Sequence, residues 1–281
     1  MAQDAYSRFK SYGTLIKTTL KTAPFPHQER ANGFLYQGKN YPADIHYSDS
    51  TVFIFIPKNA KLGNKIDMVV YLHGWWAKVD SVLTKFMLIE QLAQAEKKNT
   101  ILVIPQLAKS VPDSYAGKLA DKNGFGSFVQ DVLLKVSDQI GVKNLRVGNI
   151  ALAGHSGGYE GIAYILSNGD LAENIKEVYI FDGLYGQLEK FTFWLLQSKG
   201  RFVNIFTKNE EGGGTENISK DFMKTMFAWK MPFKSINESD LTLSILENNQ
   251  ILHIFSNSKH NQVVYLSNNF YKFLVTSQYL K

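Results

Sequence analysis

The chain has 281 residues, of which 44% are hydrophobic and 13% aromatic, and this is enough apolar material for one large α/β domain. Lysine and arginine outnumber the acidic residues to give a net charge of +6, but they are scattered and form no stripe that could track a phosphate backbone, so we do not expect nucleic-acid binding. Because the chain has no cysteine, disulfides, thiolate metal sites and a cysteine nucleophile are excluded.

The start of the chain bears on its location. No apolar run approaches the ~20 residues that a membrane-spanning helix needs, so we expect no membrane span. The first ten residues also lack the hydrophobic core of a signal peptide. We nevertheless predict a periplasmic or secreted protein, because Ala2, Gln3 and Asp4 are typical of a mature chain after signal cleavage. A cytoplasmic protein is the alternative, and the start of the native gene distinguishes the two.

The first third of the chain is typical of strands separated by turns. Residues 43–49 alternate between apolar and polar, residues 51–57 are a β-branched and aromatic run, and residues 65–76 contain a buried strand followed by glycine. We expect these strands to form the antiparallel edge of a sheet. Residues 1–42 are predicted to be an N-terminal extension that packs on the domain.

From residue 81 onward, apolar strands alternate with amphipathic helices, which is the pattern of crossover connections and a mostly parallel sheet. The predicted helices cover residues 81–98, 124–141, 156–166, 187–198, 215–229 and 262–279. The predicted strands cover residues 100–105, 149–154, 177–182, 201–207 and 251–256.

We therefore predict a single α/β domain over residues 1–281, with a mostly parallel twisted central sheet, an antiparallel N-terminal edge and helices on both faces. No internal repeat or linker divides the series. Residues 109–123 are the candidate lid, and residues 230–240 have weak structure signals.

Polar residues follow several of the predicted strands at their carboxyl ends. Loops at this edge of a parallel sheet converge on a crevice, so side chains there are expected to lie close together. The residues at these ends are His73 with Gly74, Ser156, Asp182 and His260.

Residues 154–158 (GHSGG) fit the pattern GxSxG between a buried strand and an amphipathic helix. A nucleophile at such a sharp turn has a strained backbone, and flanking glycines remove side chains that would collide with neighbouring strands. The helix that follows directs N–H groups and a positive dipole end at the same place. The alternative is that Ser156 is a helix N-cap. We favour the nucleophile because a cap requires neither a downstream acid nor a downstream histidine.

A serine hydroxyl needs a base to remove its proton, and the base needs a carboxylate to orient it. Of the six histidines, only His260 lies in a loop between the last predicted strand and the last helix, although an exposed loop histidine is the alternative. Asp182 ends an apolar run, where a lone carboxylate is costly without a partner. Glu210 and Glu211 stay open as alternative acids, although their glycine-rich loop is typical of solvated carboxylates.

The loop with His73 and Gly74 is predicted to complete an anion site. The backbone N–H of Trp75 would join that of Gly157 in facing a carbonyl oxygen, and the indoles of Trp75 and Trp76 would form a wall of the pocket. Ordinary core packing is the alternative for both tryptophans. The residues that we expect to contact substrate are His73, Gly74, Trp76, Tyr159 and Tyr185.

The segments YLHGWW, LAGHSGGY, YIFDGLYG and SKHNQV resemble the α/β hydrolase family, in its order of oxyanion loop, serine, acid and histidine. The resemblance extends from about residue 43 to the end. It implies Ser156 as nucleophile, Asp182 as orienting acid and His260 as general base and acid.

The resemblance also implies acyl transfer through a covalent acyl-enzyme, a reaction that needs no metal and no cofactor. We expect a serine hydrolase that acts on a small-molecule carboxylic ester. An amidase or peptidase with the same triad is a close alternative. The alternative from another class is a non-catalytic protein that binds glycan or cell-wall material on an aromatic stacking surface.

Overall fold

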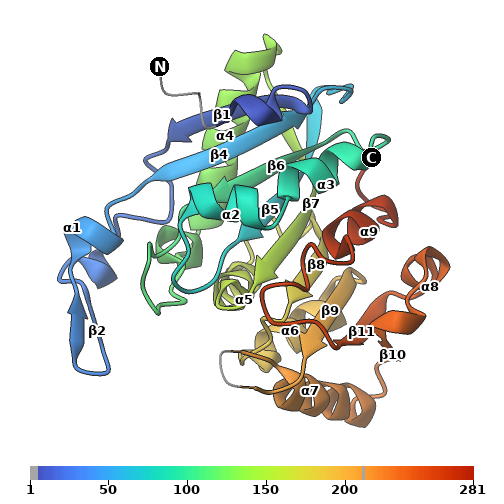
Figure 1. Cartoon of the computed structure of the whole chain (residues 1–281). Helices are drawn as coiled ribbons and strands as arrows, with labels where there is room; N and C mark the ends of the chain where they lie inside the picture. Colours follow the sequence, from blue (N-terminus) through green and yellow to red (C-terminus); the bar gives the residue numbers. More distant parts are fainter. Residues whose placement is uncertain (1–5, 211–212) are drawn as a thin grey trace.

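A nine-stranded sheet crosses the protein in the order β1-β4-β6-β5-β7-β8-β9-β11-β10 (Figure 1). The computed structural model describes residues 6–210 and 213–281. The sheet strands are β1 (Gly13–Thr19), β4 (Thr51–Pro57), β5 (Lys65–Leu72), β6 (Thr100–Pro105), β7 (Arg146–His155), β8 (Ile175–Phe181), β9 (Arg201–Thr207), β10 (Lys234–Asn237) and β11 (Ile251–Ser256).

Strand direction follows the sequence pattern. From β6 to β10 all neighbouring strands are parallel, because a helix or a long crossover returns the chain to the same edge each time. Strand β4 is antiparallel to both β1 and β6, so the N-terminal edge of the sheet, formed by β1 and β4, is antiparallel. The predicted α/β fold with a mostly parallel sheet and an antiparallel N-terminal edge is therefore confirmed.

Helices cover both faces of the sheet. Helices α4, α5, α6 and α7 share one hydrophobic core with the sheet, and α2, α3, α8 and α9 share the other. Successive side chains of a strand point to opposite faces, so Leu152 of β7 belongs to the first core and Ala151 to the second. The helices are α1 (Ala43–His46), α2 (Val79–Lys85), α3 (Leu88–Gln94), α4 (Gly124–Ile140), α5 (Gly158–Asn168), α6 (Leu188–Gln197), α7 (Glu216–Ala228), α8 (Leu243–Asn248) and α9 (Asn269–Val275).

Three elements differ from the sequence expectation. Residues 43–49 do not form a strand; α1 begins directly after Pro42, whose fixed φ suits the start of a helix. The helix expected over 81–98 is broken into α2 and α3 at Met87, which has a φ of 52°. The last helix is shorter than expected and begins after Asn268, which also has a left-handed backbone.

The N-terminal extension contributes to the sheet as well as packing on it, because β1 is the edge strand beside β4. A hairpin of β2 (Phe34–Tyr36) and β3 (Lys39–Tyr41) forms a separate two-stranded sheet. The expected mature start at Ala2, Gln3 and Asp4 lies outside the described residues.

The candidate lid at residues 109–123 is anchored to this extension and to Tyr47, which follows α1. Asp113 is buried and accepts hydrogen bonds from Arg30 Nε at 2.7 Å and from the Tyr47 hydroxyl at 2.9 Å. Val111 lies in a small core with Phe25 and Tyr47. That this segment moves as a lid stays a prediction.

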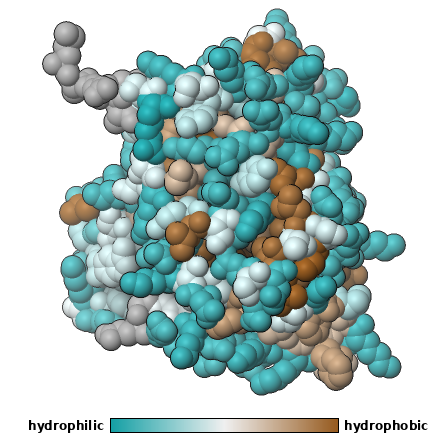
Figure 2. All heavy atoms as spheres, turned by 45° about the vertical axis from the view of Figure 1, so that its right-hand side comes forward, coloured by the Kyte–Doolittle hydropathy of each residue, from teal (hydrophilic) through white to brown (hydrophobic). Residues whose placement is uncertain are grey.

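The surface in Figure 2 is mostly hydrophilic, with apolar residues in separate patches. None of the helices in the described part of the chain is both long and apolar enough to cross a membrane.

The two-core architecture gives a stability prediction. Phe128 on α4 is fully buried, so Phe128→Ala removes a ring and leaves a cavity, at a cost of about 3–5 kcal/mol in the free energy of unfolding. Leu134 on the same helix is 62% exposed, and Leu134→Ala is expected to change stability by less than about 0.5 kcal/mol. Urea unfolding measures both, and equal costs would contradict this packing.

Candidate active site

The loops that follow β5, β7, β8 and β11 meet at the carboxyl edge of the sheet. These strands are parallel and lie side by side, with only β9 between β8 and β11. Gly74 follows β5, Ser156 follows β7, Asp182 follows β8 and His260 lies in the turns after β11. Residues that are far apart in the sequence thus come together at one edge.

Ser156 occupies a left-handed backbone conformation with a φ of 53°, between the end of β7 and the start of α5. This conformation is strained for a residue with a Cβ atom, and it turns the side chain out of the sheet. Neighbouring chain segments approach closely. A Cβ atom on Gly74 would lie 2.6 Å from Ser156 Cβ, and one on Gly183 would lie 2.7 Å from the Ser156 carbonyl oxygen. Glycine at both positions allows the serine turn to fit.

Two backbone N–H groups beside Ser156 are free to bind an anion. Within residues 6–210 and 213–281, neither the N–H of Trp75 nor that of Gly157 has a hydrogen-bond acceptor. The loop with Trp75 lies against Gly157, since a Cβ atom on Gly74 would be 2.9 Å from Gly157 N. Helix α5 begins at Gly158 and adds the positive end of its dipole.

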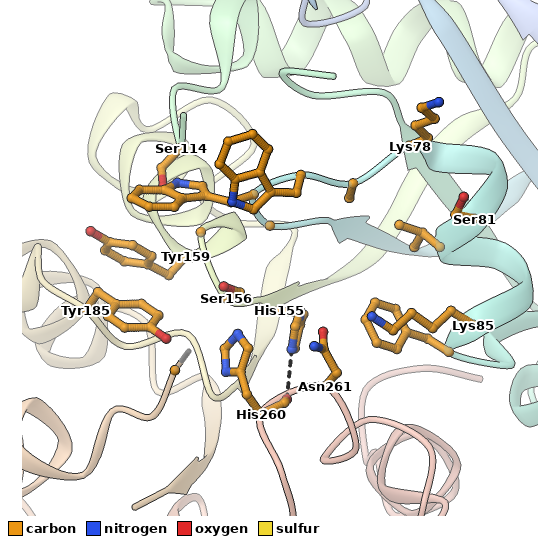
Figure 3. A pocket seen from close by; sticks show the side chains of 18 residues that line it. Lys78, Ser81, Lys85, Ser114, His155, Ser156, Tyr159, Tyr185, His260 and Asn261 are labelled. Carbon is orange, nitrogen blue, oxygen red and sulfur yellow. Dashed lines mark hydrogen bonds between the residues drawn. The ribbon is translucent and has the colours of Figure 1, made fainter. Parts of the chain in front are cut away.

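His260 and Asp182 form a close pair. His260 Nδ1 lies 2.7 Å from Asp182 Oδ2, so Nδ1–H donates to the carboxylate and Nε2 is left as an acceptor. In Figure 3 the His260 ring extends toward the Ser156 hydroxyl. The Asp182 carboxylate is fully buried and also accepts from Thr207 N at 2.9 Å, from the Thr207 hydroxyl at 2.6 Å and from the Thr215 hydroxyl at 3.0 Å.

The hydrogen-bond donors around Asp182 determine whether its carboxyl group is ionised. Burial alone would raise the pKa of the carboxyl group, but the hydrogen bonds from His260 and Thr207 and the charge of His260 bring that pKa below its usual value. The carboxylate is therefore ionised at neutral pH and suited to hold the imidazole.

The alternative acids do not share this position. Glu210 is exposed and its backbone pairs with Gly213, while Glu211 lies outside the described residues. Gly213 itself packs against the imidazole, because a Cβ atom there would lie 2.5 Å from His260 Cγ.

His155, the residue before Ser156, hydrogen-bonds to the loop that carries His260. Its Nε2–H donates to the His260 carbonyl oxygen at 3.0 Å, and the two rings lie 4.6 Å apart. Burial lowers the pKa of His155 to about 3, so this imidazole stays neutral. In the sequence it occupies only the variable position of the GxSxG pattern, which carries no signal for its contact with His260.

A cavity of about 840 Å³ opens beside Ser156 (Figure 3). Tyr159 and Tyr185 lie on one side of Ser156, and Lys78, Ser81 and Lys85 of the α2 region lie on the other. We name the first side the aromatic lobe, formed by Trp75, Ser114, Tyr159 and Tyr185. The second side is the lysine lobe, formed by Lys78, Ser81, Val82, Lys85 and Phe86.

Within the aromatic lobe, the Trp75 indole lies over Gly157 and its Nε1–H donates to the Ser114 hydroxyl at 2.7 Å. Burial raises the pKa of Tyr185 to about 12, against opposing hydrogen bonds with Gly214 and Ser156, so its hydroxyl keeps its proton at neutral pH. Sequence reasoning named Trp75, Tyr159 and Tyr185 but missed Ser114.

Of the expected substrate contacts, Gly74, Trp76, Tyr159 and Tyr185 line the cavity, whereas His73 does not. His73 is buried behind the loop, where Nδ1 bonds to the Gly74 carbonyl at 2.9 Å and Nε2 accepts from Leu107 N at 2.9 Å. Burial lowers its pKa to about 4. The structure does not support the prediction that His73 contacts substrate, because its ring nitrogens bind the Gly74 and Leu107 backbone and the Gln106 side chain.

Solved structures share this architecture. The feruloyl esterase module from Clostridium thermocellum, complexed with sinapinate, aligns with a TM-score of 0.56 at 14% identity, covering 98% of this chain and 92% of that chain. The S-formylglutathione hydrolase from Agrobacterium tumefaciens aligns with a TM-score of 0.52 at 12% identity, covering 95% of each chain. The chain has the α/β hydrolase fold. FphF, a fluorophosphonate-binding serine hydrolase of Staphylococcus aureus, aligns with a TM-score of 0.51 at 11% identity, covering 94% and 99%.

No family model and no curated protein sequence matches the chain. The α/β hydrolase fold is thus shown by the structure.

The ionised Asp182 gives a prediction for stability against pH. A carboxyl group whose folded pKa is depressed stabilises the fold above its unfolded pKa of ~3.9, and this contribution is lost as the pH falls through the folded pKa. We expect Asp182→Asn to cost about 2 kcal/mol at pH 7, because an amide cannot accept all of these hydrogen bonds. We measure the free energy of unfolding in urea from pH 7 to pH 3. The difference between wild type and Asp182→Asn should become smaller below pH 4.

Asp221 provides the matched control. Its carboxylate is exposed and pairs with Lys224 at 2.8 Å on the surface of α7, so Asp221→Asn should change stability by less than about 0.5 kcal/mol throughout. A cost for Asp182→Asn that is the same at every pH would contradict the assigned ionisation.

Proposed function

We propose that this protein is a serine hydrolase that cleaves carboxylic esters, with Ser156 as nucleophile, His260 as general base and acid, and Asp182 as orienting acid. The observation that carries the proposal is the 2.7 Å contact between His260 and the buried, ionised Asp182, with the imidazole directed to a serine in a strained turn.

The reaction follows from these positions. His260 Nε2 takes the proton of Ser156 Oγ as Oγ attacks the ester carbonyl carbon. The carbonyl electron pair moves to oxygen, and the resulting oxyanion accepts hydrogen bonds from the N–H groups of Gly157 and Trp75. When the intermediate collapses, the C–O bond to the alcohol breaks and the alcohol takes the proton from Nε2. Water then repeats the sequence on the acyl-enzyme and releases the acid.

Ester cleavage is favoured over amide cleavage by the nature of the similar structures. Two of the three neighbours described above are named as a feruloyl esterase and an S-formylglutathione hydrolase, and both names describe acyl esters or thioesters. An amidase or peptidase would use the same Ser156, His260 and Asp182, and paired ester and amide substrates of one acyl group separate the two.

A non-catalytic binding protein is the second candidate, and one observation favours it. The aromatic rings at the cavity mouth are open to solvent, with Trp75 41%, Trp76 55% and Tyr185 38% exposed, as a stacking surface for sugar rings requires. In a non-catalytic binding protein Ser156 would not act as a nucleophile. Reaction with an acylating or phosphonylating probe therefore distinguishes the two functions.

We expect a fluorophosphonate probe to label the wild-type protein once, at Ser156, and not to label Ser156→Ala. The same substitution should lower kcat/KM for an activated ester by on the order of 10⁴-fold or more, because the nucleophile is lost. Intact mass spectrometry, peptide mapping and a chromogenic ester assay measure these outcomes.

Ser167→Ala is the matched control for labelling, since Ser167 lies on α5 beyond the turn and its exposed hydroxyl donates only to the Tyr164 carbonyl. It should label like wild type. An unlabelled wild-type protein that still binds glycans would refute the hydrolase and support the binding protein.

A further inference from the structure

Helix α2 turns a basic face to the cavity. Lys78, Ser81, Val82 and Lys85 follow the spacing i, i+3, i+4 and i+7, which places them on one side of a helix, and all four line the cavity. Asp80 of the same helix takes another direction and bonds to Lys17 Nζ at 3.1 Å. The acidic side chain of α2 is thus paired elsewhere, and the helix contributes no carboxylate to the cavity lining.

Lys85 is the lysine that reaches inward. In Figure 3 its ammonium group points toward the middle of the cavity, whereas that of Lys78 points away from it. The Lys85 ammonium lies 5.5 Å from the centre of the Phe86 ring, which also lines the cavity. Its charge acts on His155 at the cavity floor, where it contributes to the lowered pKa of that imidazole.

The Lys85 charge has no anionic partner within the described part of the chain. No carboxylate lies within ion-pair distance of it there, and the described residues that line the cavity include no aspartate or glutamate. The aromatic lobe on the other side of Ser156 carries no charged side chain. An unpaired cation on one side of the serine and neutral rings on the other make the cavity electrically asymmetric.

We infer that Lys85 binds an anionic group of the substrate, so that the enzyme prefers esters that carry a carboxylate, sulfate or phosphate several bonds from the ester carbonyl. This inference rests on the proposed function and names the substrate class of that site. The spacing follows from the cavity, because Lys85 lies on α2 across His155 from the serine, and an anion bound there is separated from the reacting carbon by a linker.

Charge selectivity is tested with two ester pairs of matched shape. In the first pair the anion is on the acyl part: p-nitrophenyl hexanoate is compared with mono-p-nitrophenyl adipate. In the second pair it is on the alcohol part: phenyl butyrate is compared with 4-sulfophenyl butyrate. For each pair the ratio of kcat/KM, anionic over neutral, is compared between wild type and variants, so that the intrinsic reactivity of the esters cancels.

We expect Lys85→Met to lower this ratio about fivefold in one of the two pairs, because an exposed charge pair contributes up to about 1 kcal/mol. Lys85→Glu should lower it roughly tenfold or more, because the introduced carboxylate repels the anionic substrate. The wild-type ratio should also fall between 20 mM and 500 mM salt, since salt screens exposed charges. The pair that responds shows whether the anion belongs to the acid or to the alcohol.

Lys97→Glu is the matched control, because it makes the same change in net charge at an exposed lysine that does not line the cavity. It should leave both ratios unchanged. If Lys85→Met and Lys85→Glu leave both ratios at the wild-type value while fluorophosphonate labelling of Ser156 is intact, the inference is wrong and the hydrolase stands. Loss of labelling in the wild type would instead refute the hydrolase, and the substrate preference with it.

Discussion

The site depends on how closely two loops approach Ser156. The serine turn is held between the loop after β5 and the loop after β8, and a Cβ atom at Gly74 or Gly183 would overlap it. This contact brings the N–H of Trp75 next to that of Gly157 and places the serine beside the loop that begins with Asp182. Gly74 and Gly183 take no part in the proposed reaction. Because they have no side chain, the loops can approach closely enough to set the distances between the groups that would react.

The second constraint is the cost of burying charge. Asp182 is fully buried beside a sheet core, and four hydrogen bonds, from His260, from the Thr207 backbone and hydroxyl and from Thr215, make its ionised form stable there. His155 and Gly213 restrain His260 from two sides. The imidazole is thereby oriented by its surroundings before any substrate enters, which lowers the reorganisation that the reaction requires.

The fold and the positions of the site residues were predictable to different degrees. The alternation of strands and helices predicted the parallel sheet, and the strands at 100–105, 201–207 and 251–256 end where they were expected to end. The broken helix at Met87 was not predictable, because a left-handed residue inside an apolar period leaves no mark in the sequence pattern. That Ser156, Asp182 and His260 come together at one edge of the sheet was predictable from strand ends and residue type. That Ser114, His155 and Lys85 line the cavity was not predicted, because their positions depend on contacts between distant segments. His73 was expected at the cavity, but its nitrogens bind the Gly74 and Leu107 backbone and the Gln106 side chain, which the sequence does not reveal.

The central claim is that Ser156 and His260 act as one unit, and a double-mutant cycle on ester hydrolysis tests it most directly. Ser156→Ala, His260→Ala and the double variant are compared by kcat/KM on one activated ester. If His260 acts through the serine, the double variant is no slower than Ser156→Ala alone. Losses that multiply in the double variant would show that the two residues act independently, and this would contradict the account.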